Sequence, residues 1–238
     1  MILDEVKNLN HGDEFIFGVA VGQINGFMHC ALLYKWEDKI RTIDFSNQAV
    51  RKNAWSIGDF GHNDFIYIKY NQHLIIDAIA MQVPSVCELI REKHDRISFG
   101  IKFDDTRFDE DGELVFANGD FGLTCATFVL AILERSFGLE LIDKSSWQRR
   151  AEDEEWQKRI LEYYKQMNIE TPDYYSEELI PHYEKNIGCF RFRPEEVSAA
   201  SGASYLPVEF YHCEECGRRV KDALTFGVQT YTKTYLSN

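Results

Sequence analysis

The segment NGDFGLTCATFVLAILERSFG, residues 118–138, places Cys125 between a polar loop with glycines and an apolar run. The apolar pattern from Cys125 to Leu133 predicts a buried helix that begins at the cysteine. Unpaired N–H groups and the dipole at a helix start can lower a cysteine pKa from about 8.5 to roughly 3.5–7.5. The chemistry of such a residue is nucleophilic attack. Because cysteine is also a common core residue, a partner base has to distinguish the two interpretations.

A histidine held by a third polar group is the usual base for a cysteine nucleophile. Of the seven histidines, His29 is the one inside an apolar strand pattern, FMHCALLYKW. The other six lie in predicted loops, at helix starts or in charged segments. His29 is therefore the candidate general base, with a buried core histidine as the alternative interpretation.

The third polar group follows from a predicted hairpin in residues 27–46. If the chain turns through two or four residues near position 37, Ala31 opposes Asp44. Opposed residues of antiparallel strands share a face, so His29 and Asp44 become diagonal neighbours about 7–8 Å apart. Aspartate is depleted in strands, and a partner on this face would explain its presence. We predict that Asp44 orients His29.

These residues resemble a known family in their type and order. A strand histidine in HCALLYKWEDKIRTIDF, a polar residue on the next strand and a later cysteine in GLTCATFVLAIL are similar to the circularly permuted papain-like hydrolases. Members include permuted NlpC-type peptidases, YiiX-like proteins and lecithin retinol acyltransferase. The resemblance covers roughly residues 12–140. It implies a nucleophile at Cys125, a general base at His29 and an orienting residue at Asp44.

The resemblance also implies an activity, a cysteine peptidase or amidase-like hydrolase or an acyl transferase that works through an acyl-enzyme. The backbone N–H of Cys125 is the expected oxyanion donor, and Gln23 is a candidate for the second. Two departures concern the substrate. Ala31-Leu32 replaces the Gly-Ile usual after the histidine, and the NCEHF motif of the acyltransferase is absent. We therefore expect a peptide, isopeptide or acyl-amide substrate, with no cofactor required for catalysis.

The expected fold is α+β, a papain-like antiparallel sheet packed on a central cysteine-bearing helix. Apolar runs predict strands at residues 13–22, 27–36, 39–46 and 64–70, and helices at residues 73–81, 84–97, 151–167 and 176–188. Charged, aromatic helices follow Gly138. We predict a catalytic domain at residues 1–144 and a partly helical C-terminal extension at residues 145–238.

The remaining cysteines are interpreted singly, because six in 238 residues are too sparse for a disulfide framework. Cys30 and Cys87 lie in apolar segments typical of small core residues. Cys213 and Cys216, in YHCEECGRR, supply half of a tetrahedral zinc site. The further ligands would be Cys189 with His182 or His212. A structural zinc ion and two ordinary thiols in a charged turn are the two interpretations of this motif.

Composition excludes some classes of partner. The chain has 26 basic and 39 acidic residues, a net charge of −13, which disfavours nucleic acid and anionic membranes. It has no apolar stretch of the roughly 18–20 residues that a membrane span needs. The start MILDEVKNLN lacks the pattern of a signal peptide, which predicts a cytoplasmic location. The alternative to an enzyme is a binding module that uses the C-terminal region for partner contacts.

Overall fold

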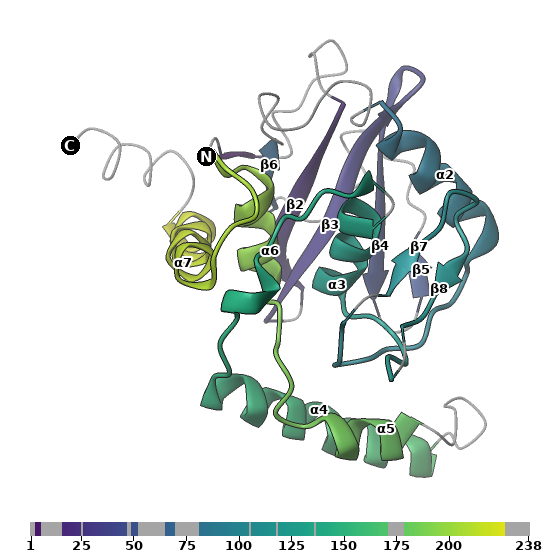
Figure 1. Ribbon diagram of the computed structural model, residues 1–238, viewed down its shortest axis with the longest axis vertical. Helices are drawn as coiled ribbons and strands as arrows, with labels where there is room; N and C mark the ends of the chain where they lie inside the picture. Colours follow the sequence, from purple (N-terminus) through teal and green to yellow (C-terminus); the bar gives the residue numbers. More distant parts are fainter. Residues whose placement is uncertain are drawn as a thin grey trace.

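The structure is a computed structural model, and its described residues form a mixed α+β protein with one main sheet (Figure 1). The described residues are 3–5, 16–24, 26–46, 49–51, 65–69, 81–104, 106–117, 119–135, 137–170 and 179–226. The α+β class agrees with the expectation from sequence.

The main sheet is antiparallel between all neighbouring strands, in the order β1-β6-β2-β3-β4-β5. Its strands are β1 (Leu3–Glu5), β2 (Phe17–Ile24), β3 (Phe27–Trp36), β4 (Lys39–Ser46), β5 (Ala49–Arg51) and β6 (Ile66–Lys69). β3 is buried without interruption from His29 to Tyr34. Such a run is typical of a strand that is covered on both faces, which is why its apolar residues do not alternate with polar ones.

The register of the β3–β4 hairpin confirms the predicted pairing. Ala31 pairs with Asp44 across a turn formed by Glu37 and Asp38. Glu37 has a φ of 55°, the left-handed conformation that tight hairpin turns use. The pairing ends at Ala31 and Asp44, although both strands continue, so β4 does not pair with Cys30.

The helices follow the sheet in the chain. They are α2 (Val83–Lys93), α3 (Cys125–Leu130), α4 (Ala151–Glu170), α5 (Leu179–Asn186), α6 (Pro194–Ser201) and α7 (Phe210–Phe226). A π-helical turn follows α3 at Ala131–Arg135, and a 3-10 turn precedes α4 at Lys144–Ser146. Between α2 and α3 lies a small hairpin of β7 (Arg107–Phe108) with β8 (Leu114–Val115). Pro84 lies in the first turn of α2, as its fixed φ favours. Another helix is predicted at residues 73–81. Residues 73–80 lie outside the described residues, and Met81 lies within them.

The main core lies between one face of the sheet and the helices α3 and α6. Leu32 of β3, Val129 of α3 and Val197 of α6 are fully buried in one apolar cluster. Figure 1 shows α3 and α6 in front of β2 and β3. A smaller cluster around Ala31 and Phe65 covers the opposite face. The cysteine helix is therefore a central element of the core.

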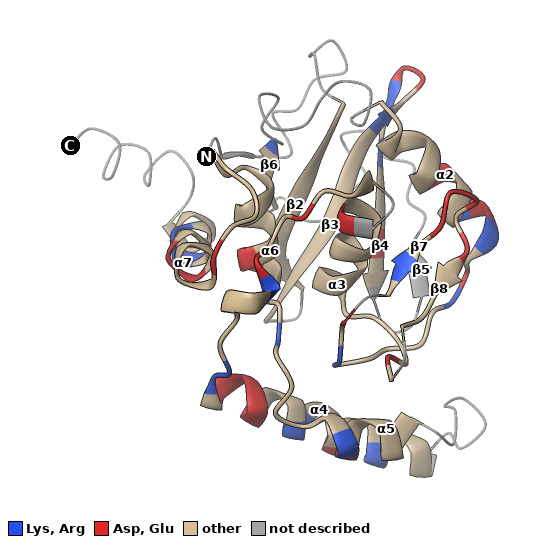
Figure 2. Cartoon of the chain, in the orientation of Figure 1, with Lys and Arg blue, Asp and Glu red and all other residues tan. Residues whose placement is uncertain are grey.

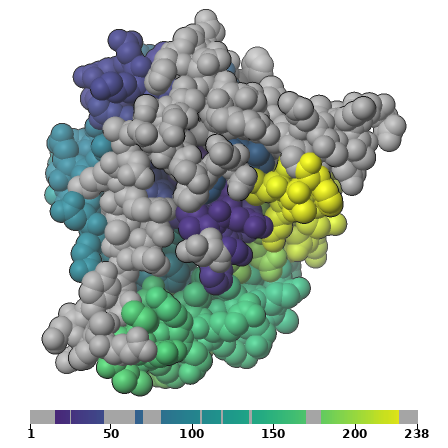
Figure 3. All heavy atoms as spheres, turned by 180° about the vertical axis from the view of Figure 1, so that it is seen from behind, coloured from purple at the N-terminus to yellow at the C-terminus, as the bar shows by residue number. Residues whose placement is uncertain are grey.

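Residues on both sides of position 144 share this core. Val197, Phe210 and Val220, from the predicted extension, belong to the same cluster as the sheet. The predicted boundary at residue 144 stays a prediction, but α6 and α7 pack as parts of the main body. The pair α4 and α5 forms one end of the molecule, as Figure 1 and the view from behind in Figure 3 both show.

Charged side chains are unevenly distributed over the elements. β2 and α3 have none, whereas α4 and α7 carry many (Figure 2). α3 therefore adds no charged side chain of its own to the interior, where a low dielectric constant strengthens the effect of an ionised group. Across the described part of the chain, no helix combines the length and the apolar character needed to cross a membrane.

Candidate active site

Cys125 is the first residue of α3, and its threonine neighbours determine where the helix starts. The backbone N–H of Thr127 donates to Oγ1 of Thr124 at 3.2 Å, and the N–H of Thr124 donates to Oγ1 of Thr127 at 2.8 Å. This reciprocal pair is a capping box, which satisfies backbone donors that the helix itself leaves unpaired. The local sequence TCAT therefore places Cys125 at a defined helix start.

The loop before Cys125 is held against residues 98–100. Leu123 N–H donates to the Ser98 carbonyl at 2.9 Å, and Gly100 N–H donates to the Leu123 carbonyl at 3.2 Å. A Cβ atom on Gly122 would lie 2.1 Å from the Ser98 oxygen, far inside van der Waals contact. Gly122 is thus required for the close approach of the two segments. The glycine-bearing loop therefore fixes the segment before the cysteine helix against residues 98–100.

His29 and Asp44 form a buried pair on adjacent strands. Nε2 of His29 lies 2.6 Å from Oδ2 of Asp44, a short hydrogen bond between side chains that are almost fully buried. The diagonal contact follows from the register in which Ala31 opposes Asp44. Because Asp44 occupies Nε2, the ring nitrogen left for another partner is Nδ1.

The half-buried Cys125 completes this arrangement. Hydrogen bonding by Cys30 holds the pKa of the Cys125 thiol well below its usual range, against the opposing effect of burial, and His29 acts in the same direction. For His29, burial alone would lower the pKa, but the charge of Cys125 and the bond to Asp44 raise it to about 9. Both shifts favour a thiolate beside an imidazolium.

Cys30 is the member of the site that sequence reasoning missed. It is fully buried in the main core, as expected for a small apolar residue, but it also contacts the Cys125 thiol. Burial raises the pKa of Cys30 well above its usual range, so its thiol stays protonated. The available signal was its position directly after His29. The Cys125 cluster is defined here as Cys30, Cys125, His29 and Asp44.

Gln23, the candidate for a second oxyanion donor, lies on the other face of the sheet from His29. It pairs with Met28, whereas Gly22 pairs with His29. Successive residues of a strand point to opposite faces, and the Gln23 side chain is exposed. Gln23 instead shares the sheet face of Met28 and Cys30, so its role as an oxyanion donor stays a prediction.

The cysteines of the predicted zinc site lie on a helix, not in a charged turn. Cys213 and Cys216 are one turn apart on α7. Sγ of Cys213 points to the Val208 carbonyl at 3.7 Å, and Sγ of Cys216 lies 3.6 Å from Nε2 of His212. Within the ranges given above, no group of three or more histidine, cysteine or acidic side chains could hold a metal ion. The zinc site remains a prediction.

The other two zinc candidates, Cys189 and His182, contact groups outside the pair Cys213 and Cys216. Cys189 donates to the Ile101 carbonyl at 3.2 Å, and burial raises its pKa to about 11. His182, on α5, packs its ring against Phe121 with centroids 5.1 Å apart.

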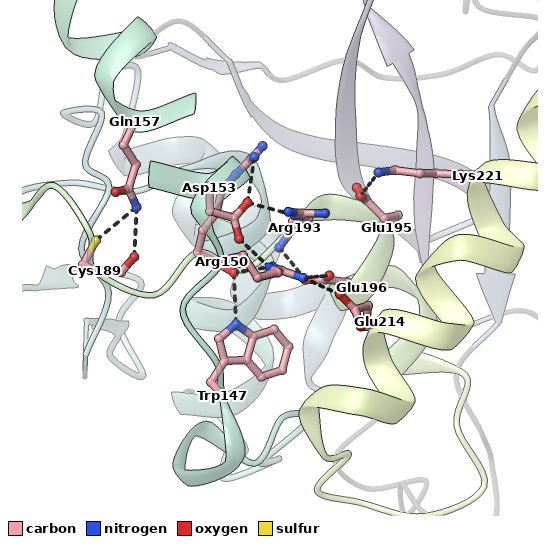
Figure 4. A network of polar contacts seen from close by, with 11 residues as sticks. Trp147, Arg150, Asp153, Gln157, Cys189, Arg193, Glu195, Glu196, Glu214 and Lys221 are labelled. Atoms are coloured by element: carbon pink, nitrogen blue, oxygen red, sulfur yellow. Dashed lines mark hydrogen bonds and ion pairs between the residues drawn. The ribbon is translucent and has the colours of Figure 1, made fainter. Parts of the chain in front are cut away.

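A second buried polar cluster joins α4, the segment before α6, α6 and α7 (Figure 4). This cluster, the Arg150 network, comprises Arg150, Asp153, Arg191, Arg193 and Glu196. Arg150 Nε lies 2.6 Å from an Asp153 oxygen, and its guanidinium also binds Glu196. Asp153 pairs with all three arginines and Glu196 with Arg150, and Glu214 of α7 lies 3.7 Å from Arg150 at the edge of the network. The network ties the helices together and contains no nucleophile.

Comparisons with family models, curated proteins and solved structures give no match to this chain. The chemistry of the site therefore rests on its own geometry.

Proposed function

We propose that this protein is a cysteine hydrolase, an amidase or peptidase, or a related acyl transferase that acts through a Cys125 thiolate. The observation that carries the proposal is the convergence of Cys125 with the hydrogen-bonded pair His29 and Asp44. A nucleophile, a base and a group that orients the base are the minimum set for this chemistry. The order of the three residues along the chain, and the cysteine helix packed on the strands of the other two, support a permuted papain-like fold.

The proposed reaction starts from the thiolate. Cys125 Sγ attacks the carbonyl carbon of the substrate, and the His29 imidazolium gives its proton to the leaving amine. The product of this step is a thioester on Cys125. His29, now neutral, takes a proton from water or from an acceptor amine as that molecule attacks the thioester. Asp44 keeps the imidazole oriented and stabilises its charged form throughout.

We propose a peptide, isopeptide or acyl-amide as the substrate. These compounds present a planar carbonyl to a thiolate and release an amine that can take the proton of His29. A cytoplasmic setting is proposed with this activity, since all six cysteines are free and a reducing compartment keeps them so.

Thiol reactivity tests the proposal without knowledge of the substrate. With limiting iodoacetamide, Cys125 should be alkylated first, and its rate should follow an apparent pKa well below 8.5. His29→Ala should move this pKa upward, because the neighbouring positive charge is lost. Mass spectrometry of the labelled peptides identifies the site and gives its rate at each pH.

The matched control is Cys216, which is also half-buried. Burial raises its pKa, so it should react only at alkaline pH. If native Cys125 resists alkylation while Cys216 reacts, the protein has no thiolate nucleophile at this site, and the binding-module interpretation replaces the enzyme.

A further inference from the structure

We infer that Cys30 is a positioning residue for Cys125, a second thiol that holds the nucleophilic sulfur in place and in its ionised form. The inference rests on the proposed function and adds a residue that the combination of nucleophile, base and orienting carboxylate does not contain. Its evidence is the position of Cys30 in the sheet, the contact with Cys125, and the charges that surround both thiols.

The register pairs of β3 with β4 end at Ala31, the residue after Cys30. This end determines what the backbone N–H of Cys30 can contact. Lys35 N–H donates to the Ile16 carbonyl, on the β2 side of β3. Backbone donors alternate in direction along a strand, so the N–H of Cys30, five positions away, points to the β4 side. No pairing joins Cys30 to β4 within residues 26–46, all of which the structure describes. Hydrogen bonding by this backbone group is one of the causes that lower the pKa of the Cys125 thiol.

The Cys30 side chain faces the same sulfur from within the core. Cys30 is completely buried, and Cys125 packs against the same apolar cluster. Hydrogen bonding between the two side chains raises the pKa of Cys30 and lowers the pKa of Cys125. Cys30 therefore offers two hydrogen-bond donors to the Cys125 sulfur, its S–H and its backbone N–H.

The surrounding charges decide which of the two thiols ionises. His29 lies beside Cys125 and stabilises a negative charge there. Asp44, on β4, and Glu195, at the start of α6, place negative charges near Cys30 and raise its pKa further. Since α6 and both strands pack against α3, these are the charged groups that face the pair. Cys30 remains the donor and Cys125 the acceptor.

The experiment compares Cys30→Ala with Cys30→Ser by the pH dependence of Cys125 alkylation. Cys30→Ala removes the thiol donor, and losing one hydrogen bond to a charged acceptor should raise the apparent pKa of Cys125 by about one unit or more. Below that pKa the alkylation rate should fall about tenfold. Cys30→Ser keeps a donor and should retain most of the wild-type profile. A role in packing alone would not produce this difference.

Cys87→Ala is the matched control, because Cys87 is also a fully buried thiol of the main core, on α2. It should leave the Cys125 profile unchanged. Circular dichroism and a thermal melt establish that each variant is folded, and if Cys30→Ala does not fold, Cys30→Val gives a second variant without the thiol donor. An unchanged Cys125 profile in a folded variant without the thiol overturns the role of the Cys30 side chain. A wild-type Cys125 pKa near 8.5 would overturn the proposed function itself.

Discussion

The Cys125 cluster and the Arg150 network are both buried and polar, yet they differ in how their charges are matched. In the network each carboxylate faces one or more guanidinium groups, and both its carboxylates are almost fully buried. In the Cys125 cluster the pKa shifts favour transfer of a proton from a thiol to an imidazole, and Cys125 is half-buried. The network is complete by itself, whereas the Cys125 cluster contains the thiol that the proposed function uses as its nucleophile.

The comparison shows that burial of polar groups does not by itself mark an active site. Ion pairs in the network neutralise one another and join helices that are distant in the chain. The Cys125 cluster is distinguished by a thiol whose pKa is lowered and a histidine whose pKa is raised, the combination that the proposed chemistry needs near neutral pH. The two clusters should therefore respond differently to substitution, the network in stability and the Cys125 cluster in reactivity.

The largest effect on stability is expected in the network. Arg150→Ala leaves Glu196 and Asp153 without their shared partner in the interior, which should lower the free energy of unfolding by about 3–5 kcal/mol. Urea denaturation measures the change. Alkylation of Cys125 at temperatures where the variant is folded should be unaltered.

Arg219→Ala provides the control, because this exposed arginine pairs with Glu215 on the surface of α7. Its loss should cost less than about 1 kcal/mol. If Arg150→Ala were as mild as Arg219→Ala, the network would not tie the helices together, and the contrast between the clusters would disappear.

A smaller effect, seen in reactivity and not in stability, is expected from Asp44→Asn. The amide cannot supply the negative charge that helps to raise the pKa of His29, so this pKa should fall from about 9. With a weaker imidazolium, the pKa of Cys125 should rise, and a shift of about one unit slows alkylation at acidic pH roughly tenfold. In a substrate assay, the alkaline limb near pH 9 should move to lower pH.

Asp38→Asn, in the exposed turn of the same hairpin, is the control for the Asp44 variant. It should change neither limb of the profile. An Asp44→Asn protein with the wild-type profile would show that the carboxylate has a structural role only.

The smallest effect is expected from Cys216→Ser on α7. The thiol is half-buried and its recorded contact is His212, so the free energy of unfolding should change by less than about 0.5 kcal/mol. Elemental analysis of protein purified without chelator tests the zinc prediction directly. About one zinc atom per chain, lost in Cys216→Ser together with stability, would make this helix a third polar cluster with a structural role.

The sequence by itself determined the elements that carry the site. The apolar pattern of residues 27–46 specified two strands joined by a short turn. The length of that turn placed His29 and Asp44 on one face, because side chains alternate between the two faces along a strand. TCAT specified a helix start at Cys125 in the same local way. These residues could be predicted because each depends only on its near neighbours in the chain.

The tertiary structure alone decided which of these elements meet. The contact of Cys30 with Cys125 joins β3 to α3, and the loop before α3 packs closely against Ser98 at Gly122. The entry of α6 and α7 into the main core depends on apolar faces that any helix of similar composition could present. Burial and charge matching are properties of a packed interior, and residues far apart in the chain acquire them only when the fold brings them together.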